Sequence, residues 1–134
     1  NHRLPSVNSV RLITTIYRTS EKPKPTGKCT FEIRELFATA LCTYFDSMLR
    51  SHLLYDVKEQ RQYDRLKKEN KRDFCASDFY GPEHCLRLIT RLPELLPYVL
   101  IDDKRLGEVV SAHRDFIQFL DHNFETFFPE VMMP

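Results

Sequence analysis

The sequence predicts an all-α fold, a compact orthogonal domain of about five helices. Apolar residues recur at helical spacing along most of the 134 residues, and no run with the alternating pattern of a strand exceeds four residues. Three glycines are too few for the many tight turns of a sheet-rich protein. Ten phenylalanines, six tyrosines and no tryptophan predict an aromatic core. The length favours one domain over residues 1–134.

The first two helices are predicted from this apolar periodicity. One follows Leu4-Pro5 and carries apolar residues at Val7, Val10, Ile13, Ile16 and Tyr17. A proline-rich basic loop over residues 19–28 leads to a long second helix, for which Thr30 is a suitable N-cap. The apolar set of this helix continues through about four turns, before the chain runs on towards residue 55: Ile33, Leu36, Phe37, Ala40, Leu41, Tyr44, Phe45, Met48 and Leu49.

The middle of the chain is predicted to hold a peripheral helix and then an unusually apolar one. Residues 56–72 are mostly charged, and Val57, Tyr63 and Leu66 are their few apolar anchors. Gly81-Pro82 then marks a helix start, because proline at the first helical position lacks only an N–H that would be unpaired there. The helix that follows is so rich in leucine that it must be buried or line a groove, and Pro93 and Pro97 are expected to bend or end it.

The closing helix is predicted to begin after Asp102, a good N-cap, and to end at Phe127-Phe128-Pro129. Its apolar residues are Leu106, Val109, Val110, Phe116, Ile117, Leu120 and Phe124. His113 lies among them, and a single histidine on an apolar face is expected to be a hydrogen-bonded core residue.

Composition and cysteine spacing argue against several functions. The net charge of +1 gives no general attraction to nucleic acid or membrane, and there is neither an apolar run of 18 residues nor a signal-peptide pattern. The four cysteines form no C-x-x-C motif, and with the five histidines they lack the spacing of a zinc site. We therefore expect a soluble intracellular protein with reduced thiols, without a metal site or a cofactor.

Catalysis by the adjacent pair His84 and Cys85 is not expected. Neighbouring side chains on a helix point about 100° apart, so these two cannot activate each other. The sequence offers Cys85 no other base and no oxyanion site. We therefore expect no enzyme, and a structural role for His84 at the start of its helix.

A basic segment over residues 58–72 is the first of two candidate surfaces. Acidic residues interleave its basic side chains, so we expect their charges to cancel locally and the segment to be a solvated helix face. The alternative is a nucleic-acid contact module, in which the contact would fall to Lys67, Lys68, Lys71 and Arg72.

The second candidate surface is indicated by a surplus of apolar residues near helix ends. A small helical domain with more apolar residues than it can bury often exposes a groove that binds another protein. The residues concerned are Leu53, Leu54, Tyr55, Tyr98, Leu106, Val109 and Val110.

The chain resembles the MRG domain, the mortality-factor-related module of chromatin adaptor proteins. Three blocks carry the resemblance: YFDSMLRSHLLYDVKEQRQY at residues 44–63, YGPEHCLRLITRLPELL at residues 80–96, and the amphipathic segment 102–128. Leu4-Pro5 fits the family's LP-initiated helix. Cys85 stands where the family usually has leucine. Glu94, Leu95 and Leu96, with the segment 127–130, are similar to male-specific-lethal, fungal and plant members. Without tryptophan, the chain is expected to lack the family's N-terminal segment, which forms one wall of its peptide pocket.

The resemblance implies a nuclear, non-enzymatic adaptor of histone acetyltransferase and deacetylase complexes that acts in transcription regulation. It places Tyr55 at the aromatic wall of the family's peptide pocket, Arg91 at its ligand-binding arginine, and Val109 and Val110 at its leucine pair. Tyr98 and Leu106 are expected beside them. Relatives bind amphipathic helices or extended peptides with a Phe-x-Leu-Pro core on such surfaces. Methyl-lysine reading is not expected, because it needs an aromatic cage on strands that this sequence lacks.

Overall fold

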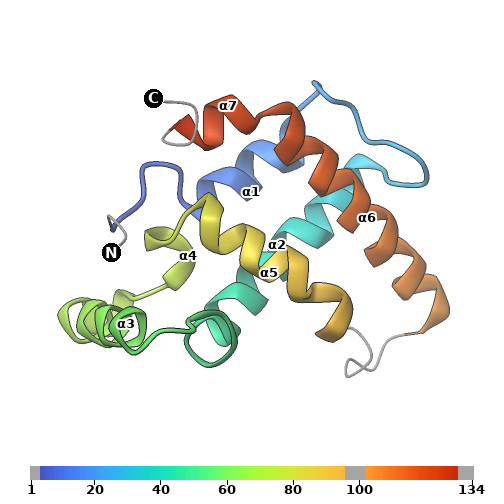
Figure 1. The fold of residues 1–134 in the computed structure, drawn as a ribbon. Coiled ribbons are helices and arrows are strands. Elements are labelled where there is room, and N and C mark those ends of the chain that lie inside the picture. Colours follow the sequence, from blue (N-terminus) through green and yellow to red (C-terminus); the bar gives the residue numbers. More distant parts are fainter. Residues whose placement is uncertain (1–3, 96–101, 130–134) are drawn as a thin grey trace.

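The structure, a computed structural model, describes residues 4–95 and 102–129, and the elements assigned there are all helical (Figure 1). Five helices have ten or more residues: α1 (Val10–Thr19), α2 (Phe31–Met48), α3 (Val57–Asn70), α5 (Pro82–Leu95) and α6 (Asp103–His122). Four shorter elements complete the described part: η1 (Leu49–Leu53), η2 (Lys71–Asp73), α4 (Ala76–Phe79) and α7 (Phe124–Phe127). The predicted all-α class is confirmed.

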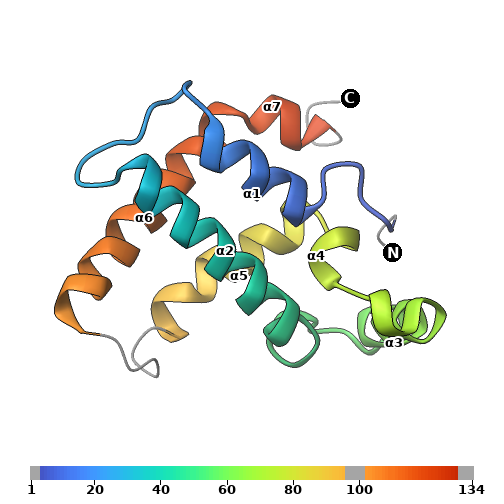
Figure 2. The same cartoon turned by 180° about the vertical axis from the view of Figure 1, so that it is seen from behind.

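The helices cross at steep angles around an aromatic core. Helix α5 crosses α2 near the centre of the molecule, and α3 lies at the opposite end from α6 in both views (Figures 1 and 2). The ring of Tyr17 on α1 meets that of Phe116 on α6 edge-on, with centroids 4.8 Å apart. Further buried aromatic residues extend this core across the helices: Phe37, Phe45, Tyr63, Tyr80, Phe119, Phe127 and Phe128.

The helix starts agree with the sequence at two of the predicted caps and differ at the first helix. Thr30 Oγ1 accepts a hydrogen bond from Ile33 N, and Asp102 Oδ1 accepts one from Arg105 N. Helix α1 begins only at Val10, so Val7 lies outside it and is 92% exposed. The cause is tertiary, because Ser6 N donates to Phe79 O at 2.7 Å and holds the preceding segment against the turn before α5.

Gly81 is required at that turn by close packing. A Cβ atom at this position would lie 2.7 Å from Ser6 Cβ and 2.9 Å from the carbonyl oxygen of Asn8, both too short for real contacts. The glycine therefore permits the approach of the N-terminal segment, beyond its predicted role as a flexible cap residue.

A histidine compensates for the proline inside α5. Pro93 has no N–H to donate to Ile89 O, one turn earlier. His113 on α6 approaches instead, with its Nε2–H donating to Ile89 O at 2.9 Å. The helix continues past Pro93 and ends at Leu95, whereas Pro97 lies outside the described residues. The predicted hydrogen bond of His113 is confirmed, whereas the residue is half-buried and lies at the edge of the core. Its bond ties α6 to α5.

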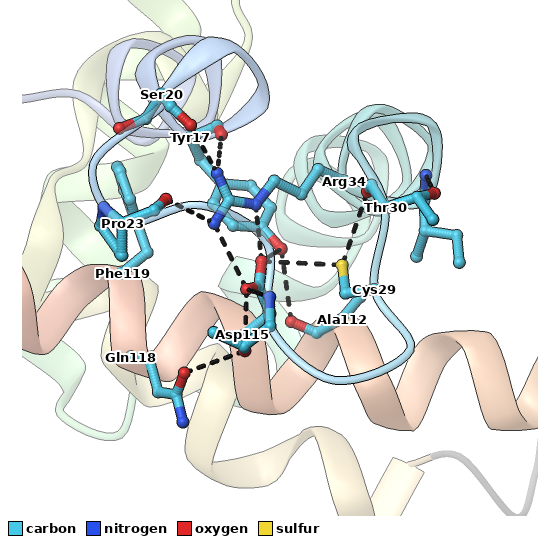
Figure 3. Close-up of polar contacts among 12 residues, drawn as sticks. Tyr17, Ser20, Pro23, Cys29, Thr30, Arg34, Ala112, Asp115, Gln118 and Phe119 are labelled. Carbon is cyan, nitrogen blue, oxygen red and sulfur yellow. Dashed lines mark hydrogen bonds and ion pairs between the residues drawn. The ribbon is translucent and has the colours of Figure 1, made fainter.

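A buried ion pair joins α2 to α6. Arg34 and Asp115 have side chains that are 0% and 1% exposed, and Arg34 Nε lies 2.6 Å from Asp115 Oδ2 (Figure 3). The remaining guanidinium donors reach three backbone carbonyl groups, those of Tyr17, Ser20 and Pro23, at 2.9–3.2 Å. Every nitrogen of the guanidinium group is thus hydrogen-bonded, which offsets the cost of burying its charge.

The carboxylate is equally well satisfied. Tyr17 OH donates to Asp115 Oδ2 at 2.8 Å, and the backbone N–H of Thr26 donates to Oδ1 at 2.9 Å. Burial alone would raise the pKa of Asp115, but the hydrogen bonds from Arg34, Tyr17 and Thr26 outweigh it and hold that pKa below its ordinary value. One ion pair therefore joins α1, the loop that follows it, α2 and α6.

Replacing Asp115 with alanine should destabilise the protein by about 3–5 kcal/mol, because Arg34 would keep a buried charge without its partner. Replacing the pair together, as Arg34→Met with Asp115→Leu, should cost less than Asp115→Ala alone. Urea unfolding followed by circular dichroism measures both free energies. A loss below about 1 kcal/mol in Asp115→Ala would contradict the assignment.

The stability of the wild type relative to Asp115→Asn should depend on pH in a defined direction. Because the folded-state pKa of Asp115 lies below its ordinary value of 3.8, the ionised carboxylate stabilises the fold fully above that value. The advantage over Asp115→Asn should therefore be constant above about pH 5 and shrink as the pH falls below about 4. Urea midpoints measured across this range test it, and an advantage that grew on acidification would contradict it.

Candidate functional site

An apolar cleft of about 680 Å³ lies between α2, α5 and α6. Its floor consists of residues that are nearly inaccessible to solvent, Phe37, Leu41, Leu92 and Ala112. The other lining residues form its walls and rim: Ile33, Leu36, Ala40, Tyr44, Met48, His52, Leu95, Arg105, Glu108 and Val109. The volume falls within the range of about 300–1,000 Å³ in which proteins bind small ligands and side-chain groups.

One face of α2 supplies half of the cleft. Its lining residues follow the three- and four-residue spacing of a helical stripe, from Ile33 at one end to Met48 at the other. Leu36 in this stripe is 56% exposed, which is unusual for a leucine on a helix face that otherwise packs into the core. The cleft is therefore a continuation of the core that the described helices leave uncovered.

Charged groups lie only at the rim of the cleft. Arg105 Nη1 lies 3.4 Å from Glu108 Oε2 one turn later on α6, so these two partly neutralise each other. His52 is exposed on the opposite wall, at the end of the α2 side. The arrangement suits a ligand with an apolar centre and polar ends.

Two arginines of α5 hold the end of the α2 wall in place. Residues Leu49–Leu53 form a turn of π-helix, a distortion found frequently at functional sites. Arg91 Nη1 donates to His52 O at 2.6 Å, and Arg87 Nη1 donates to Leu53 O at 2.8 Å. Arg87 also lies 2.9 Å from Glu59 Oε2, which connects this turn to the start of α3.

The predicted site residues are only partly brought together. Val109 lines the cleft, and Arg91 borders it through its bond to His52. Leu106 and Val110, which are 38% and 43% exposed, lie beside the α6 wall and are not lining residues. Tyr55 is 62% exposed and its ring lies against the guanidinium group of Arg87, outside the cleft.

Of the other apolar residues predicted for this surface, two are buried and one cannot be placed. Tyr98 lies outside the described residues. Leu53 and Leu54, expected among the surplus apolar residues, are 0% and 3% exposed and belong to the core. Leu53 ends the π-helical turn and Leu54 follows it in an extended conformation, so a regular helix pattern could not indicate that both are buried.

The cleft residues on α2 were missed as functional residues, because the sequence assigned them all to a buried helix face. A signal was present in the breadth of that face. Ile33, Leu36, Ala40 and Tyr44 widen the apolar stripe beyond what the buried positions Phe37, Leu41 and Phe45 need. A helix that is apolar over such an arc must be covered on two sides or remain open on one.

The described residues show no arrangement suited to catalysis at Cys85 or to metal binding. Cys85 is completely buried, and burial raises its pKa to about 12, so it is a protonated thiol at neutral pH. His84 is buried beside Glu59, whose Oε2 lies 3.7 Å from His84 Nε2. In the same ranges, no three His, Cys, Asp or Glu side chains gather where they could hold a metal ion. None of the helices there combines the length and apolarity of a membrane span.

The family model described as MRG matches residues 1–132. The chain belongs to the MRG family. This chain is 35% identical to Protein MRG1 of Arabidopsis thaliana over 106 residues, which cover 79% of this chain and 32% of that protein. It is 31% identical over 128 residues to Chromatin modification-related protein eaf3 of Emericella nidulans, with 93% of this chain and 39% of the relative covered.

A third relative is named as a subunit of a complex. The NuA4 complex subunit EAF3 homolog of Dictyostelium discoideum is 36% identical over 85 residues, which cover 63% of this chain and 22% of that protein. The matched regions thus span between 22% and 39% of the length of these three MRG relatives.

Proposed function

We propose that this MRG chain is an adaptor without catalytic activity, which binds a short apolar peptide segment of a partner protein in the cleft between α2, α5 and α6. The observation that carries the proposal is the open apolar stripe of α2, in which Leu36 is 56% exposed. Exposed apolar surface of this kind costs solubility, and in monomeric proteins it commonly marks a protein-binding site.

The energetics of the cleft fit a modest, reversible affinity. A phenylalanine or leucine side chain that leaves water for an apolar site contributes about 1.5–3 kcal/mol. Two such anchors, less the cost of ordering a flexible peptide, support a dissociation constant in the micromolar range. A peptide with a Phe-x-Leu-Pro core or an amphipathic helix carries anchors of this kind.

The polar groups at the rim would orient such a peptide. The Arg91 guanidinium binds His52 O through Nη1 and lies 3.7 Å from Glu94 Oε2 through Nε, so Nη2 is the group we assign to a ligand carbonyl or carboxylate. Val109 would contact an apolar side chain directly. Tyr55, Leu106 and Val110 are proposed as flanking contacts outside the cleft, since all three expose apolar surface near its rim or near Arg87.

The family relationship supports a setting for this activity. Relatives are named as chromatin modification-related and as subunits of the NuA4 complex. We therefore propose that the chain acts in the nucleus, as one interaction module within histone acetyltransferase or deacetylase assemblies that regulate transcription.

The variant Leu36→Glu should weaken peptide binding at least about tenfold. A bound peptide would cover the new carboxylate on the apolar stripe and remove its hydration. Fluorescence anisotropy with a labelled Phe-x-Leu-Pro peptide, and with an amphipathic helical peptide, measures the change. Circular dichroism should show unchanged helicity, since Leu36 is more than half exposed.

Leu12→Glu is the matched control. Leu12 is a 41% exposed leucine on α1, outside the cleft, and receives the same change of charge. Its affinity should stay within about twofold of the wild type. Equal affinities of wild type and Leu36→Glu for a peptide that both bind, or equal losses in the two variants, would refute the proposed cleft.

A further inference from the structure

Helix α3 carries a second surface, separate from the cleft, formed by four basic residues on its outer side. Lys58, Arg61, Arg65 and Lys68 follow the spacing i, i+3, i+7 and i+10, so they share one side of the helix. All four are exposed. We call these four residues the α3 basic stripe.

The opposite side of α3 is fixed against the rest of the molecule, which keeps the stripe pointing outward. Tyr63 is buried, and its ring meets that of Phe74 edge-on at 5.2 Å. The start of the helix is held by a capping box, in which Asp56 and Glu59 accept hydrogen bonds from backbone N–H groups. Both figures that show the whole chain place α3 at its periphery (Figures 1 and 2).

The acidic residues of this helix neutralise the stripe only in part. Residues 57–72 contain seven basic and three acidic side chains, and the sequence predicted that their charges cancel locally. Glu59 pairs with Arg87 of α5 and Asp64 pairs with Arg50 of η1, so two of the three acidic side chains are directed away from the stripe. Glu69, four residues after Arg65, is exposed on the same side of the helix and offsets one of the four positive charges. Within the described ranges, no carboxylate forms an ion pair with a residue of the stripe.

We propose that the α3 basic stripe binds the phosphate backbone of double-stranded DNA without reading its sequence. The stripe is about 15 Å long, enough to follow several phosphates of one strand. The outer side of α3 exposes one large apolar residue, Val57, whereas a protein partner or a membrane surface requires a set of apolar anchors. Single-stranded nucleic acid requires exposed aromatic rings for base stacking, and the one aromatic residue of α3, Tyr63, is buried.

The test is the salt dependence of binding to a fluorescent duplex of about 20 base pairs of arbitrary sequence. Wild type should bind weakly at low salt, with a slope of log K against log salt of about −3 to −4 for four phosphate contacts. Replacing Arg61, Arg65 and Lys68 by Gln together should lower the affinity at least about tenfold and reduce the magnitude of the slope by about three. Unchanged helicity by circular dichroism confirms that the triple variant is folded.

The control triple variant replaces Lys24, Lys104 and Arg114 by Gln, which removes the same charge from exposed positions elsewhere. Its affinity should stay within about threefold of wild type. Equal losses in the two triple variants, no binding by wild type at about 25 mM salt, or competition by poly-glutamate as effective as by unlabelled duplex would each overturn the proposal. Leu36→Glu should retain full DNA binding, so a failure of the cleft proposal and a failure of this one are distinguishable.

Discussion

The buried ion pair between Arg34 and Asp115 is the constraint on which the rest of the structure depends. It fixes the distance between α2 and α6, the two helices that form opposite walls of the cleft. The same guanidinium group binds the carbonyl oxygens at the end of α1 and in the loop after it, so an irregular segment is held without secondary structure of its own. Because a buried charge is costly unless all of its hydrogen bonds are made, small displacements of α2 against α6 are strongly disfavoured.

A second set of contacts fixes α5 against these two helices. His113 of α6 supplies the donor that Pro93 removes from the hydrogen-bond ladder of α5, and Arg87 and Arg91 of α5 hold the π-helical turn after α2. In each contact a side chain donates a hydrogen bond to a backbone carbonyl group at a place where the regular α-helical hydrogen-bond pattern is interrupted. The three helices are thus joined by polar bonds around a space with apolar walls, which keeps the cleft open without a covering element in the described part of the chain.

The sequence predicted the helices well because their signals are local. Thr30 and Asp102 cap the helices they precede, Gly81-Pro82 marked the start of α5, and apolar periodicity located α1, α2 and α6. The features that the sequence did not predict depend on tertiary contacts. Arg34 is one of 20 lysine and arginine residues, nothing local distinguishes it from the rest, and its partner lies 81 residues away. The exposure of Leu36 and the pairing of Glu59 and Asp64 with arginines outside α3 also depend on which helices become neighbours. The composition of the sequence therefore indicated that both candidate surfaces exist, but not which residues form them.

A titration of methyl-labelled protein with a Phe-x-Leu-Pro peptide, monitored by nuclear magnetic resonance, tests most directly whether the α2–α5–α6 cleft is the binding site. Binding in the cleft should produce the largest shift changes at the methyl groups of residues that line it: Ile33, Leu36, Leu92, Leu95 and Val109. Methyl groups on the distant α1 surface, such as those of Leu12 and Ile16, should not respond. Large changes confined to α1 or α3, with the cleft methyl groups unaffected, would show that the peptide binds elsewhere.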